Sequence, residues 1–224
     1  MAHGHGAYAN ARDALRGFDL SPCQGRRVLL KPNAGRLVAA GTGVVTDPQV
    51  VAAAIDAFRE AGATVAIGES PISGVNTLEA LETCGIAAVA RKRNCPLIDL
   101  DARPAVRVAI PDGVAVRELQ VGAEVLEHDL LVSIPVLKMH MHTGVSLGVK
   151  NLKGCLWRRS KVGFHMIPPI PGRSEKTIDI AISDMATVLR PHFSLVDGTV
   201  GMEGLGPSAG QAREANWVAA GIDP

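Results

Sequence analysis

The first third of the chain alternates between short apolar runs and a helical pattern. Residues 26–31 form an apolar run that predicts a strand. Residues 46–48 place oxygen-bearing side chains before a proline, which is typical of a helix start, and apolar positions at helical spacing then continue to Gly62. A second apolar run follows at residues 64–68. This order predicts two parallel strands joined by a right-handed crossover, with ligands binding at the carboxyl ends of the strands.

Similar patterns recur along the rest of the chain. They predict helices at residues 7–20, 77–84, 86–92 and 176–189, and strands at 96–100, 106–110, 129–136 and 193–197. The run at 129–136 is nearly all apolar, as expected of a central parallel strand that is covered on both faces. The sequence therefore predicts an α/β fold with an open, mainly parallel sheet and helices on both faces. We expect residues 1–224 to form a single domain of this kind.

Composition narrows the class of protein. Of the 224 residues, 47% are hydrophobic and 20% are charged, which excludes collagen-like, coiled-coil and disordered chains. No run approaches the ~18 apolar residues of a membrane span, and the first residues do not resemble a secretory signal. The four cysteines are scattered and form no CxxC pair, which fits a reduced set of thiols. We expect a globular cytoplasmic protein with no membrane partner.

The formal net charge of +1 argues against a dedicated nucleic-acid binder, but the charge is unevenly distributed. Between residues 138 and 176 there are eight Lys and Arg residues against a single Glu. Gly, Ser, Thr and Asn interleave with these charges, a mixture typical of a loop-borne anion site, although a solvated face gives the same count. Trp157 and Phe164 offer little surface for base stacking. We expect residues 138–176 to form a basic insertion of loop and helix that contributes to a site, with no nucleic-acid partner.

Polar side chains follow four of the predicted strands. Lys31 and Asn33 close the first strand, Glu69 and Ser70 follow the second, Lys138 follows the central one, and Asp197 ends the last. Because the carboxyl ends of parallel strands meet at one edge of a sheet, we expect these side chains to converge in one crevice. For any single strand, a terminal charge is also common as a solubilising feature. Together the four predict a pocket that binds a small anionic ligand.

Two histidines follow the central strand. His140 and His142 are two residues apart, so on an extended backbone both imidazoles lie on one face and can bind one divalent metal ion. Such a site needs a further ligand, and the candidates are Asp197, Glu203, His165 or a cysteine. The alternative is that one histidine is a hydrogen-bonded donor and the other is exposed. We favour that alternative while still placing one histidine in the site.

Lys150 and Lys153 lie about one helical turn apart and therefore share a face of a helix. With Thr143 before them, they can hold a phosphate or carboxylate through ammonium groups and backbone N–H donors. Two solvated lysines on a surface turn explain the same spacing. Neither GxxxxGK[ST] nor GxGxxG is present in the required place, so the standard nucleotide-binding fingerprints do not apply.

The segment 197–207 is rich in glycine and holds two carboxylates, Asp197 and Glu203. We expect a loop whose backbone approaches a ligand closely, with the carboxylates ligating a cation or orienting a lysine, or else an ordinary surface loop. Cys155 follows the lysines, where cations favour a thiolate, but a buried inert thiol is the better interpretation. Asp99 and Asp101 are expected to be solvated strand ends.

Six motifs occur together in an order that resembles a known family. They are Lys31-Pro32-Asn33 and residues 46–51, 68–71, 134–145, 150–154 and 197–207. They are similar to the domain of unknown function 362 family, from Arg26 to the end of the chain. Members are often fused to a ferredoxin-like domain with iron–sulfur clusters, which implies redox work and a ferredoxin-like partner. This chain has no iron–sulfur cysteine motif, and compared with the family domain we expect it to be shortened at both ends.

These observations lead to two hypotheses. The first is a redox- or metal-linked enzyme that acts on a small anionic substrate, with a divalent metal as the candidate cofactor. The second is a non-catalytic module that holds an anion or cofactor for an iron–sulfur partner. For the enzyme, the candidate catalytic residues are Lys138, His140 and Lys150, the candidate anion-binding residues are Lys31, Asn33, Ser70, Thr143, Asn151 and Lys153, and the candidate metal ligands are His140, His142, Asp197 and Glu203.

Overall fold

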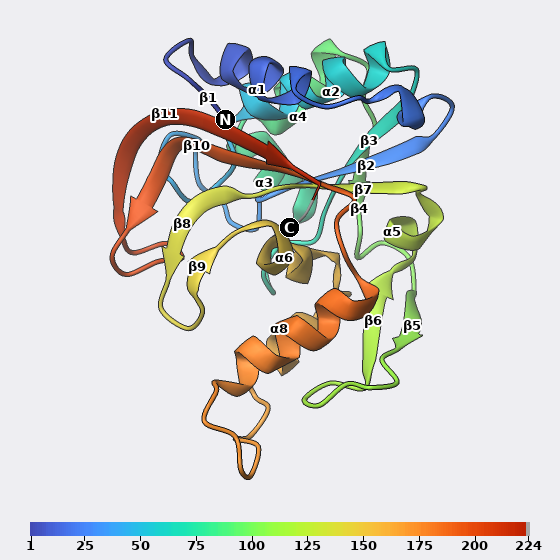
Figure 1. Ribbon diagram of the computed structural model, residues 1–224, viewed down its shortest axis with the longest axis vertical. Coiled ribbons are helices and arrows are strands. Elements are labelled where there is room, and N and C mark those ends of the chain that lie inside the picture. The colour runs from blue at the N-terminus through green and yellow to red at the C-terminus, as the bar shows by residue number, and fades with distance from the viewer. Residues whose placement is uncertain (223–224) are drawn as a thin grey trace.

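One twisted sheet runs through the protein (Figure 1). The computed structural model describes residues 1–222, and within them nine strands form this sheet in the order β1-β11-β10-β7-β2-β3-β4, with β8 beside β10 and β9 beside β8. The strands are β1 (Ala2–His3), β2 (Arg27–Pro32), β3 (Thr64–Glu69), β4 (Leu97–Asp99), β7 (Leu130–Ile134), β8 (Val136–His140), β9 (Gly144–Ser146), β10 (Phe193–Glu203) and β11 (Gln211–Gly221). Two further strands, β5 (Ala105–Ala109) and β6 (Glu118–Gly122), form a separate antiparallel pair.

The centre of the sheet is parallel, as the sequence predicts. Strand β2 pairs in parallel with β3 on one side and β7 on the other, and β7 continues to β10. Within the described sheet, each antiparallel pair includes β9 or β11: β1 with β11, β11 with β10, and β9 with β8. A crossover helix separates β2 from β3, which is the connection that parallel neighbours require.

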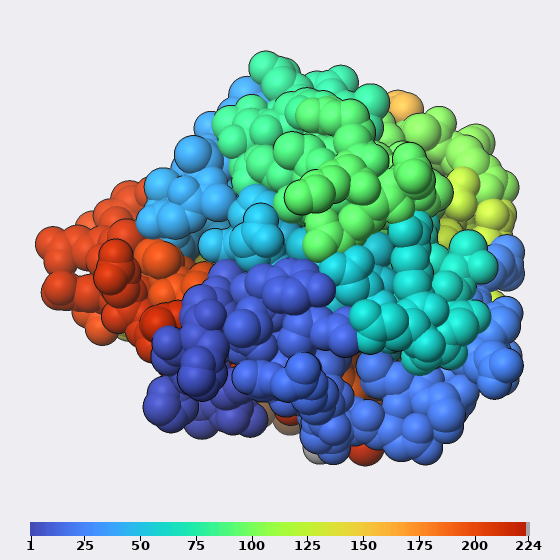
Figure 2. Space-filling model, turned by 90° about the horizontal axis from the view of Figure 1, so that it is seen from above, coloured from blue at the N-terminus to red at the C-terminus, as the bar shows by residue number. Residues whose placement is uncertain are grey.

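Helices cover both faces of this sheet. On one face lie α1 (Ala7–Arg16), α2 (Pro48–Glu60), α3 (Thr77–Thr83) and α4 (Ile86–Lys92), together with the short turn η1 (Ser21–Cys23). On the other face lie α5 (Ala123–Glu127), α6 (Gly148–Asn151), η2 (Leu152–Cys155), α7 (Ser160–Gly163) and α8 (Thr177–Val188) (Figure 1). Seen from the side of α1 and α2, the surface consists mainly of the N-terminal half of the chain, and the hairpin of β10 and β11 projects at one edge (Figure 2).

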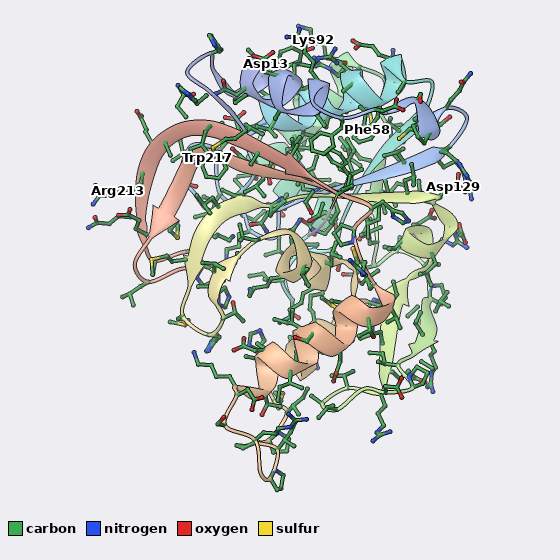
Figure 3. All side chains as sticks on the ribbon, in the orientation of Figure 1. Asp13, Phe58, Lys92, Asp129, Arg213 and Trp217 are labelled. Atoms are coloured by element: carbon green, nitrogen blue, oxygen red, sulfur yellow. The ribbon has the colours of Figure 1, made fainter. Side chains whose placement is uncertain are left out.

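The alternation of side chains along the strands divides the core into two parts. In β2, Val28 and Leu30 join the core beneath α2, where Phe58 also packs (Figure 3), whereas Leu29 joins the core on the opposite face. Successive side chains of a strand point to opposite faces, so Lys31 points to the same face as Leu29. The strand therefore carries its apolar side chains into both cores and places one lysine on the face that is covered by α6 and η2.

The structure corrects the predicted strand at 129–136. It divides at Pro135 into β7 and β8, because proline has no N–H group to donate to a neighbouring strand. The carbonyl of Pro135 accepts a hydrogen bond from the amide of Asp197 at 2.8 Å. Both β8 and β9 belong to the sheet, so the basic segment 138–176 is not a simple loop and helix insertion.

The glycine-rich segment at 197–207 is also corrected. Up to Glu203 it is not a loop but the continuation of β10, which pairs along its length with β11. Gly198 lies directly under the indole of Trp217, and a Cβ atom built on Gly198 would come within 2.5 Å of the ring (Figure 3 labels Trp217). This glycine therefore serves the packing of the hairpin and not the approach of a ligand.

No helix within residues 1–222 is long and apolar enough to cross a membrane. Residues 223 and 224 lie outside the described residues.

We predict that Gly198→Ala lowers the free energy of unfolding by about 1–3 kcal/mol, because the new methyl group forces the indole of Trp217 out of its place. Urea denaturation followed by tryptophan fluorescence measures this change. Gly163→Ala is the matched control, because no atom lies within 4 Å of its Cβ position. Equal stability of the two variants would contradict the packing argument.

Candidate functional site

A cavity of about 530 Å³ opens where β2, β3 and β7 end. Its walls come from the carboxyl ends of these strands, from β8, and from α6, η2 and α7. Of the candidate residues at the strand ends, Lys31, Asn33, Glu69, Ser70 and Lys138 line this cavity, and Asp197 does not. The expected convergence therefore holds for three of the four strand ends.

The charges around this cavity are mostly positive. Six basic side chains line it, against Glu69 as the single carboxylate among its described lining residues; the six are Lys31, Arg36, Lys138, Lys150, Lys153 and Lys161. Like charges held this close together in a partly desolvated space repel one another, and an anion that enters reduces the repulsion. The cavity is therefore suited to a ligand that carries negative charge.

A buried ion pair forms the floor of the cavity. The Nζ of Lys31 lies 2.7 Å from Oε1 of Glu69, and each side chain is only 1% exposed. Lys31 also donates to the carbonyl of Pro32 at 2.6 Å and to Oδ1 of Asn151 at 3.5 Å. Glu69 accepts the backbone amides of Ala34 and Ser70. Because all three protons of Lys31 already have acceptors, Lys31 supports the site and does not offer a free donor to a ligand.

The segment at 150–154 holds this pair in place. Nδ2 of Asn151 donates to the carbonyl of Lys31 at 2.9 Å and to the hydroxyl of Ser133 at 3.1 Å. The backbone of Gly154 passes so close that a Cβ atom there would lie 2.6 Å from Cε of Lys31 and 2.7 Å from Oε1 of Glu69. Asn151 is thus a positioning residue, and Gly154 is required by the close approach of the ion pair.

Lys138 is buried and its amine donates to the carbonyl of Val44 at 2.7 Å. Burial lowers the pKa of Lys138 to about 7, and the charges of Arg36 and Lys31 act in the same direction against the opposite influence of Glu69. This lysine therefore exchanges its proton in the neutral range.

Lys150 and Lys153 lie on the wall that α6 and η2 form, so their expected common face is present. The Nζ of Lys153 lies 2.7 Å from Nε2 of His165, and burial followed by the charge of Lys161 lowers the pKa of Lys153 to about 8. Burial and the charges of Lys153 and Lys138 lower the pKa of Lys150 to about 7. Within the described chain, the amine of Lys150 has no hydrogen-bond or ion-pair partner.

His140 ends β8 and lines the cavity. Its Nδ1 accepts the amide N–H of His142 at 3.2 Å, so the proton of the neutral ring is on Nε2. Burial first, and then the charge of Lys150, lowers the pKa of His140 to about 3. For His165, burial and then the charge of Lys153 lower the pKa to about 4. At physiological pH the His140 ring is therefore neutral. Its one hydrogen bond in the described chain is accepted at Nδ1 and not donated, whereas His142 is exposed, as the alternative to a metal site expects.

The predicted metal-ligand set of His140, His142, Asp197 and Glu203 is not assembled. Asp197 is buried and accepts the amides of Asp47 and Thr199 at 2.7 and 2.9 Å. Glu203 is exposed and pairs with Arg213 at the hairpin. Over residues 1–222, no group of three His, Cys, Asp or Glu side chains is arranged to hold a metal ion. The basic lining of the cavity also repels a divalent cation, so these residues do not fit a resident metal.

Two other candidates have roles that differ from those predicted. Thr143 lies in the turn between β8 and β9, where its hydroxyl donates to the carbonyl of Val145 at 3.1 Å, and it does not line the cavity. The hydroxyl of Ser70 donates to Asp101 at 2.6 Å and accepts from Lys161. Ser70 is therefore committed to protein contacts, as Asn151 is.

Sequence reasoning placed Glu69 at the end of its strand but gave it no role in the site. It missed Lys161 as a site residue and described Asp101 wrongly as solvated. Lys161 lies 3.7 Å from Asp101 and also donates to the backbone carbonyls of Ser70 and Pro71. The signal was present in part, because Lys161 belongs to the basic segment. The inert interpretation of Cys155 is confirmed, because the thiol is fully buried and burial raises its pKa to about 12.

We predict that Glu69→Gln lowers the free energy of unfolding by about 3 kcal/mol or more, because it leaves the buried charge of Lys31 without a counter-charge. The double variant Lys31→Met with Glu69→Gln should recover part of this loss, which a double-mutant cycle by denaturant unfolding measures. Glu82→Gln, in an exposed pair with Arg91, is the control and should change stability little. Additive effects of the two substitutions in the buried pair would contradict this account.

Comparison with known proteins agrees with the fold. The chain is 31% identical over 199 residues to a thylakoid-associated protein of Synechocystis sp.. The alignment covers 89% of this chain and 60% of that protein, so the chain spans less than two thirds of the relative's length.

Two solved structures share the fold at low identity. The lactate racemase apoprotein from Thermoanaerobacterium thermosaccharolyticum superposes with a TM-score of 0.65 at 19% identity, covering 99% of this chain and 53% of that one. A protein from Thermotoga maritima gives a TM-score of 0.52 at 15% identity, covering 99% and 57%. The family described as Domain of unknown function (DUF362) matches residues 28–224. Because this match spans most of the chain and agrees with the motifs in its sequence, the chain belongs to the DUF362 family.

Proposed function

We propose that this chain is an enzyme that binds a small anionic substrate in the lysine-lined cavity and moves protons on it. The observation that carries the proposal is the crowding of basic side chains around a cavity with a single carboxylate, which is already paired. A volume of about 530 Å³ suits a small molecule.

Three side chains supply charge for the anion. Arg36, Lys138 and Lys153 all line the cavity, and none of them has a carboxylate partner within residues 1–222. A carboxylate or phosphate placed among them gains charge-assisted hydrogen bonds. Lys31 does not bind the anion directly, because its three protons are donated to Glu69, Pro32 and Asn151.

The groups for proton transfer are His140, Lys138 and Lys150. A neutral His140 with its proton on Nε2 can donate to a substrate oxygen that gains charge in the reaction, without itself becoming an imidazolium. The pKa values of about 7 of Lys138 and Lys150 lie near physiological pH, where a group exchanges protons most effectively. No step of this proposal passes through a metal ion.

The comparison with lactate racemase is compatible with this substrate class. That protein is named for lactate, a small carboxylate, and it shares the fold of this chain. At 19% identity the likeness carries the fold alone, so the proposal rests on the cavity.

One observation favours the second hypothesis, an accessory module for an iron–sulfur partner. Beside the cavity, β8 and β9 and the turn between them expose the apolar side chains of Met139, Met141 and Val145. A ferredoxin-like partner that covers this surface would supply the redox link that the family resemblance implies. Copurification with an iron–sulfur protein, without turnover by the chain alone, would support this second function.

We predict that sulfate binds at least about tenfold more tightly at pH 6 than at pH 9. A lysine carries its charge below its pKa, and the pKa values of Lys138, Lys150 and Lys153 are about 7, 7 and 8, so these charges are lost as the pH rises between these limits. Sulfate keeps its own charge over this range, so calorimetric titration isolates the protein's contribution.

Lys153→Met should weaken sulfate binding, whereas Lys92→Met should leave it unchanged, because Lys92 lies in the helical layer on the opposite face of the sheet (Figure 3). Equal affinity at both pH values, or an equal effect of the two variants, would remove the proposed anion site.

We predict that the protein exchanges carbon-bound hydrogen of a small 2-hydroxy or 2-oxo carboxylate with solvent deuterium. The exchange should be slower by about tenfold or more in His140→Ala, because the donor to the charged oxygen is lost. Proton NMR in D₂O measures the rate for each acid of a panel, with the folded state checked by circular dichroism. If the wild-type protein binds the acids but exchanges none of them, the enzymatic proposal fails and the accessory function remains.

A further inference from the structure

The five lysines of the cavity differ in how their amines are engaged. Lys31 and Lys161 are saturated by protein acceptors, Lys138 donates to the carbonyl of Val44, and Lys153 contacts His165. In the part of the chain that the structure describes, the amine of Lys150 alone among these five has no such contact. Its lone pair, once the proton has left, is therefore available to a ligand.

The backbone on both sides of Lys150 is fixed to the sheet. The hydroxyl of Ser133 in β7 donates to the carbonyl of Gly148 at 2.9 Å, and Asn151 donates to that same hydroxyl and to the carbonyl of Lys31. Gly148 and Asn151 are the first and last residues of α6, so the helical turn that carries Lys150 is held at both ends. This arrangement presents the amine to the cavity from a rigid support.

The charges of two other cavity lysines act on Lys150. Lys153 and Lys138 lower its pKa together with burial, and its charge in turn contributes to the lowered pKa of His140. At pH 7 about half of the Lys150 amine is neutral, compared with about one part in 2,500 for an ordinary exposed lysine with a pKa of about 10.4. Desolvation beside other cations is a recognised way to make a lysine nucleophilic.

We propose that Lys150 is a nucleophile that forms an imine with the carbonyl group of a small anionic aldehyde or 2-oxo acid. This inference rests on the proposed function, because the basic side chains must first hold the carboxylate of the substrate. It narrows the substrate class from small anions to anions that also carry a carbonyl.

The step balances without a further reactant. The lone pair of Nζ attacks the carbonyl carbon, a C–N bond forms, and a proton moves from nitrogen to the former carbonyl oxygen to give a carbinolamine. The C–O bond then breaks, the second hydrogen of the amine leaves, and one water molecule carries away the oxygen with both hydrogens. Nε2–H of His140 can donate a hydrogen bond to that oxygen as it gains charge. The resulting imine withdraws electrons from the neighbouring carbon and eases proton removal there.

Reductive trapping tests the assignment. The full chain is mixed with glyoxylate, the smallest aldehyde acid, and with cyanoborohydride at pH 7, and peptide mass spectrometry then locates the carboxymethyl group that reduction leaves. We expect Lys150 to be modified at least about tenfold faster than the exposed lysines Lys92 and Lys176. Excess sulfate should slow the modification of Lys150 and leave that of Lys92 unchanged.

Two variants complete the test. Lys150→Arg keeps a cation but has no nucleophilic amine, so it should lose the fast phase of modification and still bind sulfate. Lys92→Arg should retain the fast phase at Lys150. Modification spread over exposed lysines while sulfate still binds would overturn the imine inference alone. If the wild-type protein fails to bind sulfate as well, the proposed function falls with it. The wild-type map decides the question even if Lys150→Arg does not fold.

Discussion

The buried ion pair between Lys31 and Glu69 is the interaction on which the site depends. Two charges removed from water are costly, and they are tolerated only when their partners are complete. Here Glu69 ends β3, Lys31 lies near the end of β2, and Asn151 and Gly154 of the segment after β9 close over both. The pair therefore ties two neighbouring strand ends to the wall that carries Lys150 and Lys153.

This pairing determines what the rest of the cavity can do. Glu69 neutralises Lys31, and Asp101 pairs with Lys161. The other basic side chains that line the cavity have no carboxylate partner in the described chain. Burial first, and then their mutual repulsion, lowers the pKa values of Lys138, Lys150 and Lys153. The same repulsion makes the empty cavity unfavourable, so a bound anion gains affinity by relieving it. Affinity for anions and an amine that is neutral at physiological pH thus both follow from basic side chains that are held together in a desolvated cavity.

Short sequence patterns predict the helices and strands whose bounds depend on neighbouring residues. The cap at Asp47 accepts the amide of Gln49, and α2, β3 and α4 begin and end within two residues of the predicted bounds. The strand ends converge because a parallel sheet requires it. The sequence alone does not predict the roles of residues that depend on partners far away along the chain. Gly198 must be a glycine because the indole of Trp217 occupies the space of a side chain. Asp197 is not a ligand because its carboxylate already accepts backbone amides. In the same way, Lys161 and Ser70 draw Asp101 into the protein through contacts that no sequence spacing reveals.

The central claim is that burial, together with the crowding of cations in this cavity, lowers the pKa values of its lysines. NMR of the protein labelled with ¹³C at lysine Cε measures each titration directly. The account predicts at least two lysine signals with midpoints near pH 7, one of them absent from Lys150→Arg, and both displaced upward by saturating sulfate. If no lysine titrates below about pH 9, or if sulfate leaves the midpoints unchanged, the cavity is not the crowded cationic site described.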